Sequence, residues 1–182
     1  NDVVQVISVS AGGTLTGARG DNPVALFGQD RLIGNVGNDT LISDGGADVL
    51  IGGAGDDALT IVDDNFFRLD GGSGIDTLTL KGDMSLDMNS ASSNSVESIE
   101  IISLGTDTQA LTLSDLDVLN MTNGTNTAVD NIDYQLGNVL VVDGTDFTDT
   151  LTLNGAQWLD TGDTTTVNGG STTFTIYQAS GK

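Results

Sequence analysis

Residues 34–60 read GNVGNDTLISDGGADVLIGGAGDDALT, in which a glycine, an aspartate and a leucine return in the same order three times. A nine-residue frame with Asp at its sixth place aligns this stretch with its neighbours. Glycine then occupies the fourth place of each block and leucine the eighth. The consecutive blocks are ALFGQDRLI (25–33), GNVGNDTLI (34–42), SDGGADVLI (43–51) and GGAGDDALT (52–60). A fifth block, GGSGIDTLT (71–79), follows the irregular stretch IVDDNFFRLD.

The nine-residue period predicts an all-β fold built as a parallel β-roll. Nine residues are too few for a helical repeat, but they fit a loop of six residues followed by a strand of three. The middle side chain of such a strand points opposite to its neighbours, so every eighth-place leucine can point into one core. Glycines let the loop adopt positive φ and turn its carbonyls inward. Two units make one coil of 2 × 9 = 18 residues, and successive coils stack as parallel strands.

The distribution of charge is one-sided. The 182 residues include 5 Lys+Arg and 26 Asp+Glu, which gives a net charge of −21. Nucleic acids and anionic membranes would be repelled by such a chain, so neither is expected as a partner. No stretch is long enough to insert into a membrane as a helix. The start NDVVQVISVS is no cleavable signal peptide, and we interpret the chain as a fragment of a longer protein.

Stacking the repeats places like charges next to one another. Asp39 falls one coil from Asp57, and Asp30 one coil from Asp48. At a strand spacing of roughly 5 Å, two carboxylates repel by about 3 kcal/mol with an effective dielectric constant near 20. A divalent cation between the coils converts this repulsion into attraction. Carboxylate and carbonyl oxygens, without nitrogen or sulfur ligands, favour Ca²⁺. The sequence therefore predicts several calcium ions as cofactors.

The chain contains no histidine and no cysteine. Disulfide bonds, thiolate zinc sites, imidazole bases and histidine-based catalytic triads are therefore excluded. The acids in the repeats are committed to metal, and no other catalytic constellation is present. We expect no enzymatic activity in this segment.

The repeats resemble a known family. GGAGDDALT and GGSGIDTLT match the pattern G-G-x-G-x-D-x-U-x of the calcium-binding RTX β-roll at every fixed place. The resemblance implies that each ion lies between two loops on the same edge, one coil apart. The lower loop supplies the second-place and fourth-place carbonyls and its aspartate. The upper loop supplies the first-place and third-place carbonyls and its own aspartate.

Carried over to this sequence, the resemblance implies four sets of metal ligands. The first set is Asn35, Gly37, Asp39, Gly52, Ala54 and Asp57. The second, next on that edge and after a one-residue insertion before Gly71, is Gly53, Gly55, Asp57, Gly71, Ser73 and Asp76. The third, on the opposite edge, is Leu26, Gly28, Asp30, Ser43, Gly45 and Asp48. The fourth would begin with Asp44, Gly46, Asp48 and Asp63, but Phe66 stands at the sixth place there.

Three regions are expected along the chain. Residues 1–24 contain an N-terminal strand and a degenerate repeat, residues 25–79 form the calcium-binding roll, and residues 80–182 form a β-rich region that continues or caps it. In this last region, SDLDVLN (114–120) predicts a short helix with Ser114 as N-cap. DGTDFTD (143–149) is interpreted as an exposed acidic loop, with a further Ca²⁺ site as the alternative.

The later phrases resemble the C-terminal part of large RTX adhesins exported by bacterial type I secretion. They are SVESIEIISLG, LTLSDLDVLNM, LVVDGTDFTDTLTLNG and TTFTIYQASGK. The resemblance implies a location outside the cell, at the surface of a Gram-negative bacterium, and the type I secretion machinery as a partner. In that family the secretion signal lies at the extreme C-terminus. The relatives continue a little beyond the position where this chain ends, which leaves the completeness of the signal open.

The expected function is a calcium-binding structural and secretion module of a cell-surface adhesin, unfolded during export and folded by extracellular Ca²⁺. One alternative is a Ca²⁺-dependent module that binds a glycan or peptide, on a host or on another surface. Ice binding is a weaker variant of it, because the outward-facing places of the repeats form no uniform threonine ladder. The other alternative is the accessory roll of a secreted enzyme.

Overall fold

The computed structural model describes the fold over most of the repeat region and over separate stretches on either side of it. The described residues are 5–8, 14–17, 30–43, 45–89, 95–122, 140–144, 149–154, 157–165 and 174–180. Side chains are described from residue 30 to residue 154 within these ranges, except that of Asp115.

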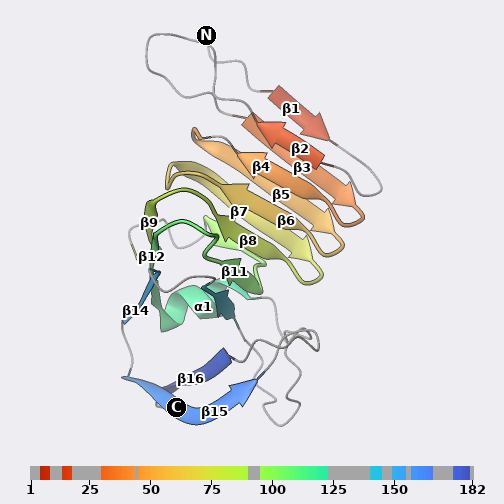
Figure 1. Cartoon of the computed structure of the whole chain (residues 1–182). Helices are drawn as coiled ribbons and strands as arrows, with labels where there is room; N and C mark the ends of the chain where they lie inside the picture. Colours follow the sequence, from red (N-terminus) through yellow and green to blue (C-terminus); the bar gives the residue numbers. More distant parts are fainter. Residues whose placement is uncertain are drawn as a thin grey trace.

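Two parallel sheets form the walls of a roll, and the chain alternates between them (Figure 1). The first sheet contains, in spatial order, β1 (Gln5–Ser8), β3 (Asp30–Val36), β5 (Asp48–Ala54), β7 (Phe66–Ser73) and β10 (Val96–Glu97). The second contains β13 (Val141–Asp143), β11 (Ile101–Ser103), β8 (Thr77–Leu80), β6 (Ala58–Ile61), β4 (Thr40–Ser43) and β2 (Thr14–Gly17). This architecture confirms the predicted all-β parallel roll.

The eighth-place leucines, together with Leu69 of the irregular stretch, form the core between the two sheets. In the first sheet Leu32 pairs with Leu50, which pairs with Leu69. In the second sheet Leu41 pairs with Leu59, and Leu59 with Leu78. All six are fully buried, at 0% exposure. Because each coil adds one leucine per sheet at the same height, the strict spacing in the sequence becomes two continuous ladders of aliphatic side chains.

The strands of the first sheet extend further than the three residues predicted. β3 and β5 each continue into the loop, where Asn35 pairs with Gly53 and Val36 with Ala54. Loops one coil apart have the same backbone conformation, so their peptide groups continue the inter-strand hydrogen bonding. The second place of the loop has positive φ, +118° at Gly53, and a Cβ there would collide with the Asn35 carbonyl.

The extra residue in the irregular stretch is absorbed by a bulge. Asp48 pairs with Phe66, but the next pair is Val49 with Arg68, so Phe67 is the additional residue. Its side chain is 71% exposed. After the bulge the register is regular again, with Gly53 opposite Gly72. The insertion therefore leaves the following loop aligned with the loop below it.

A third parallel sheet joins the roll after residue 80. It contains β14 (Thr150–Asn154), β12 (Gln109–Ser114) and β9 (Met84–Asp87). From this point one coil visits three sheets, because β10, β11 and β12 follow one another along the chain. The second sheet continues in the same register, with Ile102 opposite both Leu78 and Val142. The aliphatic core therefore extends into the region where the nine-residue period has faded.

The predicted short helix is confirmed as α1 (Asp115–Met121), which follows β12 directly. Ser114 is its N-cap, and Ser114 and Asp117 form a reciprocal capping box. Further along, β15 (Gln157–Thr165) and β16 (Phe174–Ser180) form a separate antiparallel pair.

Candidate metal centre

Three glycine-rich loops stack along one edge of the roll, where the chain passes from the first sheet to the second (Figure 1). We call this edge, made of residues 34–39, 52–57 and 71–76, the acidic edge. Hydrogen bonds join each loop to the next: Gly37 N–H donates to the Ala54 carbonyl (2.7 Å), and Gly55 N–H to the Ser73 carbonyl (2.9 Å). The first and second predicted ligand sets are therefore brought together, each on two adjacent loops.

The sixth-place aspartates of the acidic edge form a ladder. Asp39 N–H donates to Asp57 Oδ1 (2.7 Å), and Asp57 N–H donates to Asp76 Oδ1 (2.8 Å). The exposure of these three residues is 2%, 2% and 0% in that order. Burial of a charged group is unfavourable unless all its oxygens find partners. One oxygen of Asp57 and of Asp76 is accounted for by a backbone N–H.

The second oxygens face a different environment. Asp57 Oδ2 and Asp76 Oδ2 are buried and have no hydrogen-bond partner. A Cβ placed on Gly52 would lie 2.5 Å from the Gly71 carbonyl oxygen and closer still to Asp57 Oδ2. The same relation holds one coil earlier, where a Cβ on Gly34 would lie 2.6 Å from Asp39 Oδ2 and closer still to the Gly52 carbonyl oxygen. At both positions, the aspartate oxygen of one block and the first-place carbonyl oxygen of the next coil lie close together, in space that a side chain other than glycine would fill.

Without a bound cation, the buried negative charges of the acidic edge destabilise the folded protein at neutral pH. Burial raises the pKa of the Asp57 carboxyl, the hydrogen bond from Asp39 N–H lowers it, and the charge of Asp39 raises it again. For Asp76, burial is again the largest cause, and the charges of Glu100 and Asp57 add to it, raising the pKa to about 7. A divalent cation beside these oxygens would remove the desolvation and repulsion together.

The donors of the acidic edge fit Ca²⁺. They are carboxylate and carbonyl oxygens only, the ligands that this ion prefers. Within the described part of the chain, no three His, Cys, Asp or Glu side chains gather into one group that could hold a metal. The set available here is two carboxylates from adjacent loops together with backbone carbonyls, as the first two predicted sites require. Bound there, Ca²⁺ would supply positive charge between the coils.

The opposite edge, where the chain returns from the second sheet to the first, differs. Of the third predicted set, Leu26 and Gly28 lie outside the described residues. Asp30 N–H donates to Asp48 Oδ1 (2.8 Å), which repeats the ladder of the acidic edge. However, Ser43 Oγ donates to Asp48 Oδ2 (2.5 Å), and Gly45 N–H donates to Ser43 Oγ (3.3 Å). Both oxygens of Asp48 therefore have partners from the protein itself.

The fourth predicted set lies only partly within the described residues. Asp44 lies outside the described residues, and Gly46 belongs to the loop that leads to Asp48. Phe66 stands one coil beyond Asp48, where the acidic edge has an aspartate. Asp63 is close enough for its charge to contribute to the raised pKa of Asp48, for which burial is the main cause. The structure thus brings two carboxylates of this set near each other without a sixth-place partner.

Sequence reasoning missed two residues that lie next to the acidic edge, one coil beyond residues 71–76: Ser98 and Glu100. Glu100 Oε2 accepts a hydrogen bond from Asp76 N–H (2.9 Å), as Asp76 Oδ1 does from Asp57 N–H. The available signal was the spacing in EIISL, because Glu100 stands two residues before the core residue Ile102, as Asp76 stands two before Leu78. Of the alternative site in 143–149, Asp146 lies outside the described residues, and Asp149 Oδ1 accepts from Gln109 N–H (3.0 Å).

Fold and edge together define a calcium-binding parallel β-roll. Residues 25–59 match the family model of the RTX calcium-binding nonapeptide repeat in four copies, so this part of the chain consists of RTX repeats and binds Ca²⁺. The match confirms the predicted repeat family; the fifth block, 71–79, lies beyond it. Neither the curated proteins nor the solved structures gave a significant match. RTX repeats are typical of secreted proteins, and no helix among the described residues is long and apolar enough to cross a membrane.

Proposed function

We propose that this chain is a calcium-dependent structural and secretion module of a cell-surface adhesin of a Gram-negative bacterium. In this proposal the module passes through a type I secretion system unfolded and folds when it meets extracellular Ca²⁺. The single observation that carries the calcium dependence is the pair of buried carboxylate oxygens, Asp57 Oδ2 and Asp76 Oδ2, that have no hydrogen-bond partner. We also propose that the segment has no enzymatic activity of its own.

The proposed coupling of folding to calcium follows from the cost of the metal-free roll. Folding brings Asp39, Asp57 and Asp76 into one buried ladder, and burial with mutual repulsion raises the pKa of Asp57 and of Asp76. Where calcium is scarce, as inside a cell, this cost opposes folding. Extracellular calcium modules bind with dissociation constants of about 10⁻⁴ to 10⁻³ M, and binding to the folded state alone favours folding by mass action.

Circular dichroism and hydrodynamic size test the calcium dependence. We expect a disordered spectrum and an expanded chain in EDTA, and a β-rich spectrum with a compact chain in millimolar Ca²⁺. Mg²⁺ at the same concentration serves as the control, because it requires octahedral geometry and gives up its water reluctantly. Equal β content in EDTA and in Ca²⁺ would contradict the proposal.

The export part of the proposal is supported by the phrases of residues 95–182 that resemble type I-secreted adhesins. It is tested by attaching a small reporter to the N-terminus of the chain in a Gram-negative host that carries a type I transporter. Transporter-dependent appearance of the reporter in the medium supports the proposal. Retention of the reporter in cells, when a complete type I substrate is exported in parallel, counts against export by this segment.

A further inference from the structure

We propose that Asp76, Ser98 and Glu100 form a further divalent-cation site at the end of the acidic edge, beyond the nonapeptide repeats, and that it takes Ca²⁺. This inference rests on the proposed calcium dependence of the two loop pairs below it. It adds ligands that the repeat pattern does not contain, since Ser98 and Glu100 belong to the stretch SIEIIS.

The geometry at Asp76 repeats that of the two sites below. A Cβ on Gly71 would lie 2.6 Å from Asp76 Oδ2 and closer still to the Ser98 carbonyl oxygen. Gly34 and Gly52 have the same relation to the aspartate of their own block and to the first-place carbonyl of the next coil. The Ser98 carbonyl therefore takes the place that the Gly52 and Gly71 carbonyls take at the other two sites.

Glu100 takes the place of the next sixth-place aspartate. Its Oε2 accepts from Asp76 N–H at 2.9 Å, close to the 2.7 and 2.8 Å of the two preceding steps of the ladder. Glu100 is 5% exposed, and Asp76 is 0% exposed with an Oδ2 that has no hydrogen-bond partner. Two buried carboxylates and a carbonyl thus lie together, with one carboxylate oxygen unused by the protein.

The register of the strands shows that the loop before Glu100 is shorter than the repeat loops. Asp70 pairs with Glu97, and Thr77 pairs with Ile101, so residues 98–100 span what residues 71–76 span one coil below. Ser98 has φ +55°, which helps the short loop to turn. Glutamate is one methylene longer than aspartate, and its carboxylate reaches Asp76 N–H from this shorter loop. The short loop also offers fewer carbonyls, so we expect this site to be weaker than the two repeat sites.

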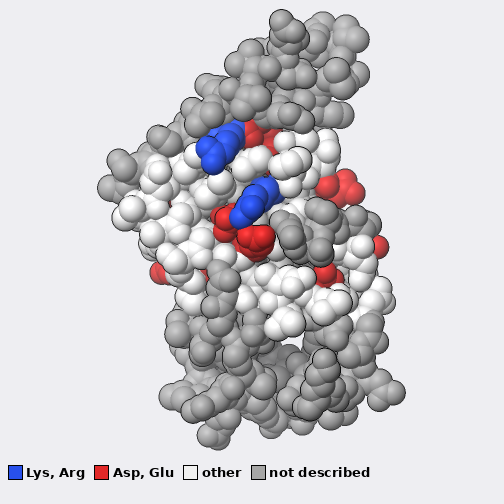
Figure 2. Space-filling model, turned by 180° about the vertical axis from the view of Figure 1, so that it is seen from behind, with Lys and Arg blue, Asp and Glu red and all other residues white. Residues whose placement is uncertain are grey.

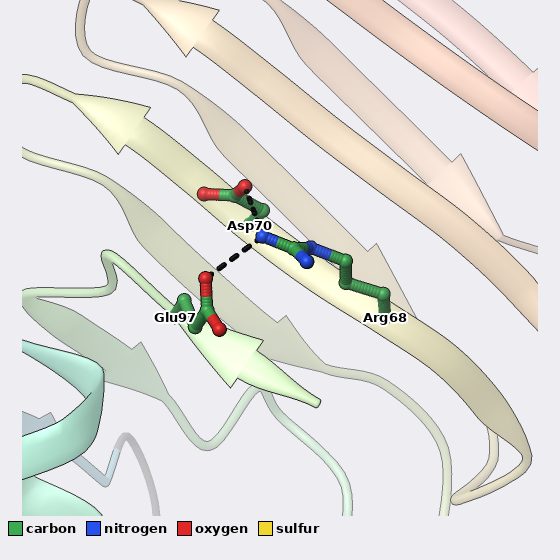
Figure 3. Close-up of polar contacts among 3 residues, drawn as sticks. All are labelled: Arg68, Asp70 and Glu97. Carbon is green, nitrogen blue, oxygen red and sulfur yellow. Dashed lines mark hydrogen bonds and ion pairs between the residues drawn. The ribbon is translucent and has the colours of Figure 1, made fainter. Parts of the chain in front are cut away.

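The basic side chain of β7 pairs with acids other than Asp76. Arg68 Nη2 donates to Asp70 Oδ2 (3.0 Å) and to Glu97 Oε2 (2.8 Å) (Figure 3). The space-filling view from behind shows basic side chains on one face with acidic groups beside them (Figure 2). The single positive charge of Arg68 is thus shared between Asp70 and Glu97. A cation between Asp76 and Glu100 would offset the negative charge of those two carboxylates.

The test is a Ca²⁺ titration of the whole chain by equilibrium dialysis, which counts the bound ions and their affinities. Glu100→Gln keeps the length of the side chain and removes its charge. We expect it to lose one ion, or to weaken the weakest class of sites about tenfold or more, with the tighter sites unchanged. Glu97→Gln is the matched control, because Glu97 is an acid of the same stretch whose carboxylate pairs with Arg68. We expect this variant to bind Ca²⁺ as the wild type does.

The outcomes separate the two proposals. If wild-type protein binds no Ca²⁺, the proposed function fails. If it binds Ca²⁺ and Glu100→Gln gives the same isotherm, only this inference is overturned. Should Glu100→Gln not fold, ¹⁵N-labelled wild-type protein decides. Amide signals of residues 98–101 that shift with the weakest binding class support the site, and signals that stop shifting once the tighter sites are filled overturn it.

Discussion

The two edges of the roll are built from the same nine-residue pattern but differ in what faces the sixth-place aspartate. On the acidic edge, Asp57 Oδ2 and Asp76 Oδ2 are buried without a hydrogen-bond partner. On the opposite edge, Asp48 Oδ2 accepts a hydrogen bond from Ser43. Beyond Asp57 the next coil presents Asp76, whereas beyond Asp48 it presents Phe66.

The first place of each block accounts for much of this difference. Ser43 and Gly52 both stand at first places, five residues before Asp48 and Asp57. At Gly52 a side chain would collide with Asp57 Oδ2, so the glycine keeps that oxygen available. At Ser43 a hydroxyl group satisfies the equivalent oxygen. The residue at the first place therefore decides whether this carboxylate oxygen has a hydrogen-bond partner within the protein.

The largest effect is expected from Asp57→Asn, because Asp57 belongs to both predicted sites of the acidic edge. Loss of its charge should weaken each of the two sites roughly tenfold and so lower their combined binding constant about 100-fold, which raises the Ca²⁺ concentration at the midpoint of folding about tenfold. Circular dichroism during a Ca²⁺ titration measures this. Asp56→Asn is the control, since exposed Asp56 accepts from Ile75 N–H, which an asparagine oxygen can also do. If Asp57→Asn folds at the same Ca²⁺ concentration as the wild type, the carboxylate of Asp57 does not contribute to calcium binding on the acidic edge.

An intermediate effect is expected from pH. The pKa of Asp76 rises from its ordinary 3.8 to about 7. Between these values the folded state binds more protons than the unfolded state, so the metal-free roll loses stability as pH rises through this window. Calcium competes with the proton, so its apparent affinity should fall about tenfold per pH unit below about pH 7.

Calorimetric titrations at about pH 8, 7 and 6 measure the dependence of calcium affinity on pH. The control is Asp76→Asn, in which the dependence should be weaker. Calcium affinity that stays constant across this range would contradict the burial of a protonatable carboxyl on the acidic edge.

The smallest effect is expected from Ser43→Ala on the opposite edge. It removes the donor to Asp48 Oδ2 and so raises the pKa of Asp48 further, because that hydrogen bond lowers it. We expect a loss of about 1 kcal/mol in the free energy of unfolding in saturating Ca²⁺, measured with urea. Calcium binding at the acidic edge should not change. Ser85→Ala, at an exposed position of β9, is the control, and equal stability of the two variants would refute the assigned role of Ser43.

The sequence predicted most of the roll because its signal is local and repeated. Leu41, Leu59 and Leu78 recur at one place of the frame, and the parallel pairing follows from that period. The same logic placed Asp39, Asp57 and Asp76 on one edge. The third sheet, with β9, β12 and β14, was not predicted, because the separation between paired strands grows from 18 residues in the repeats to 25 between β9 and β12 and 40 between β12 and β14. Because the number of residues per coil changes from one coil to the next, the sequence of this region shows no constant repeat length.

The sequence by itself determined the core, the stacking of the coils and the excess of carboxylates, whose mutual repulsion a cation would reduce. Only the tertiary structure decided which carboxylate oxygens have hydrogen-bond partners within the protein and which have none. That choice depends on residues one coil apart or five places away, such as Ser43 for Asp48 and Ser98 for Asp76. The physical reason is that hydrogen bonding and metal binding compete for the same lone pairs, and their geometry is set when the coils stack.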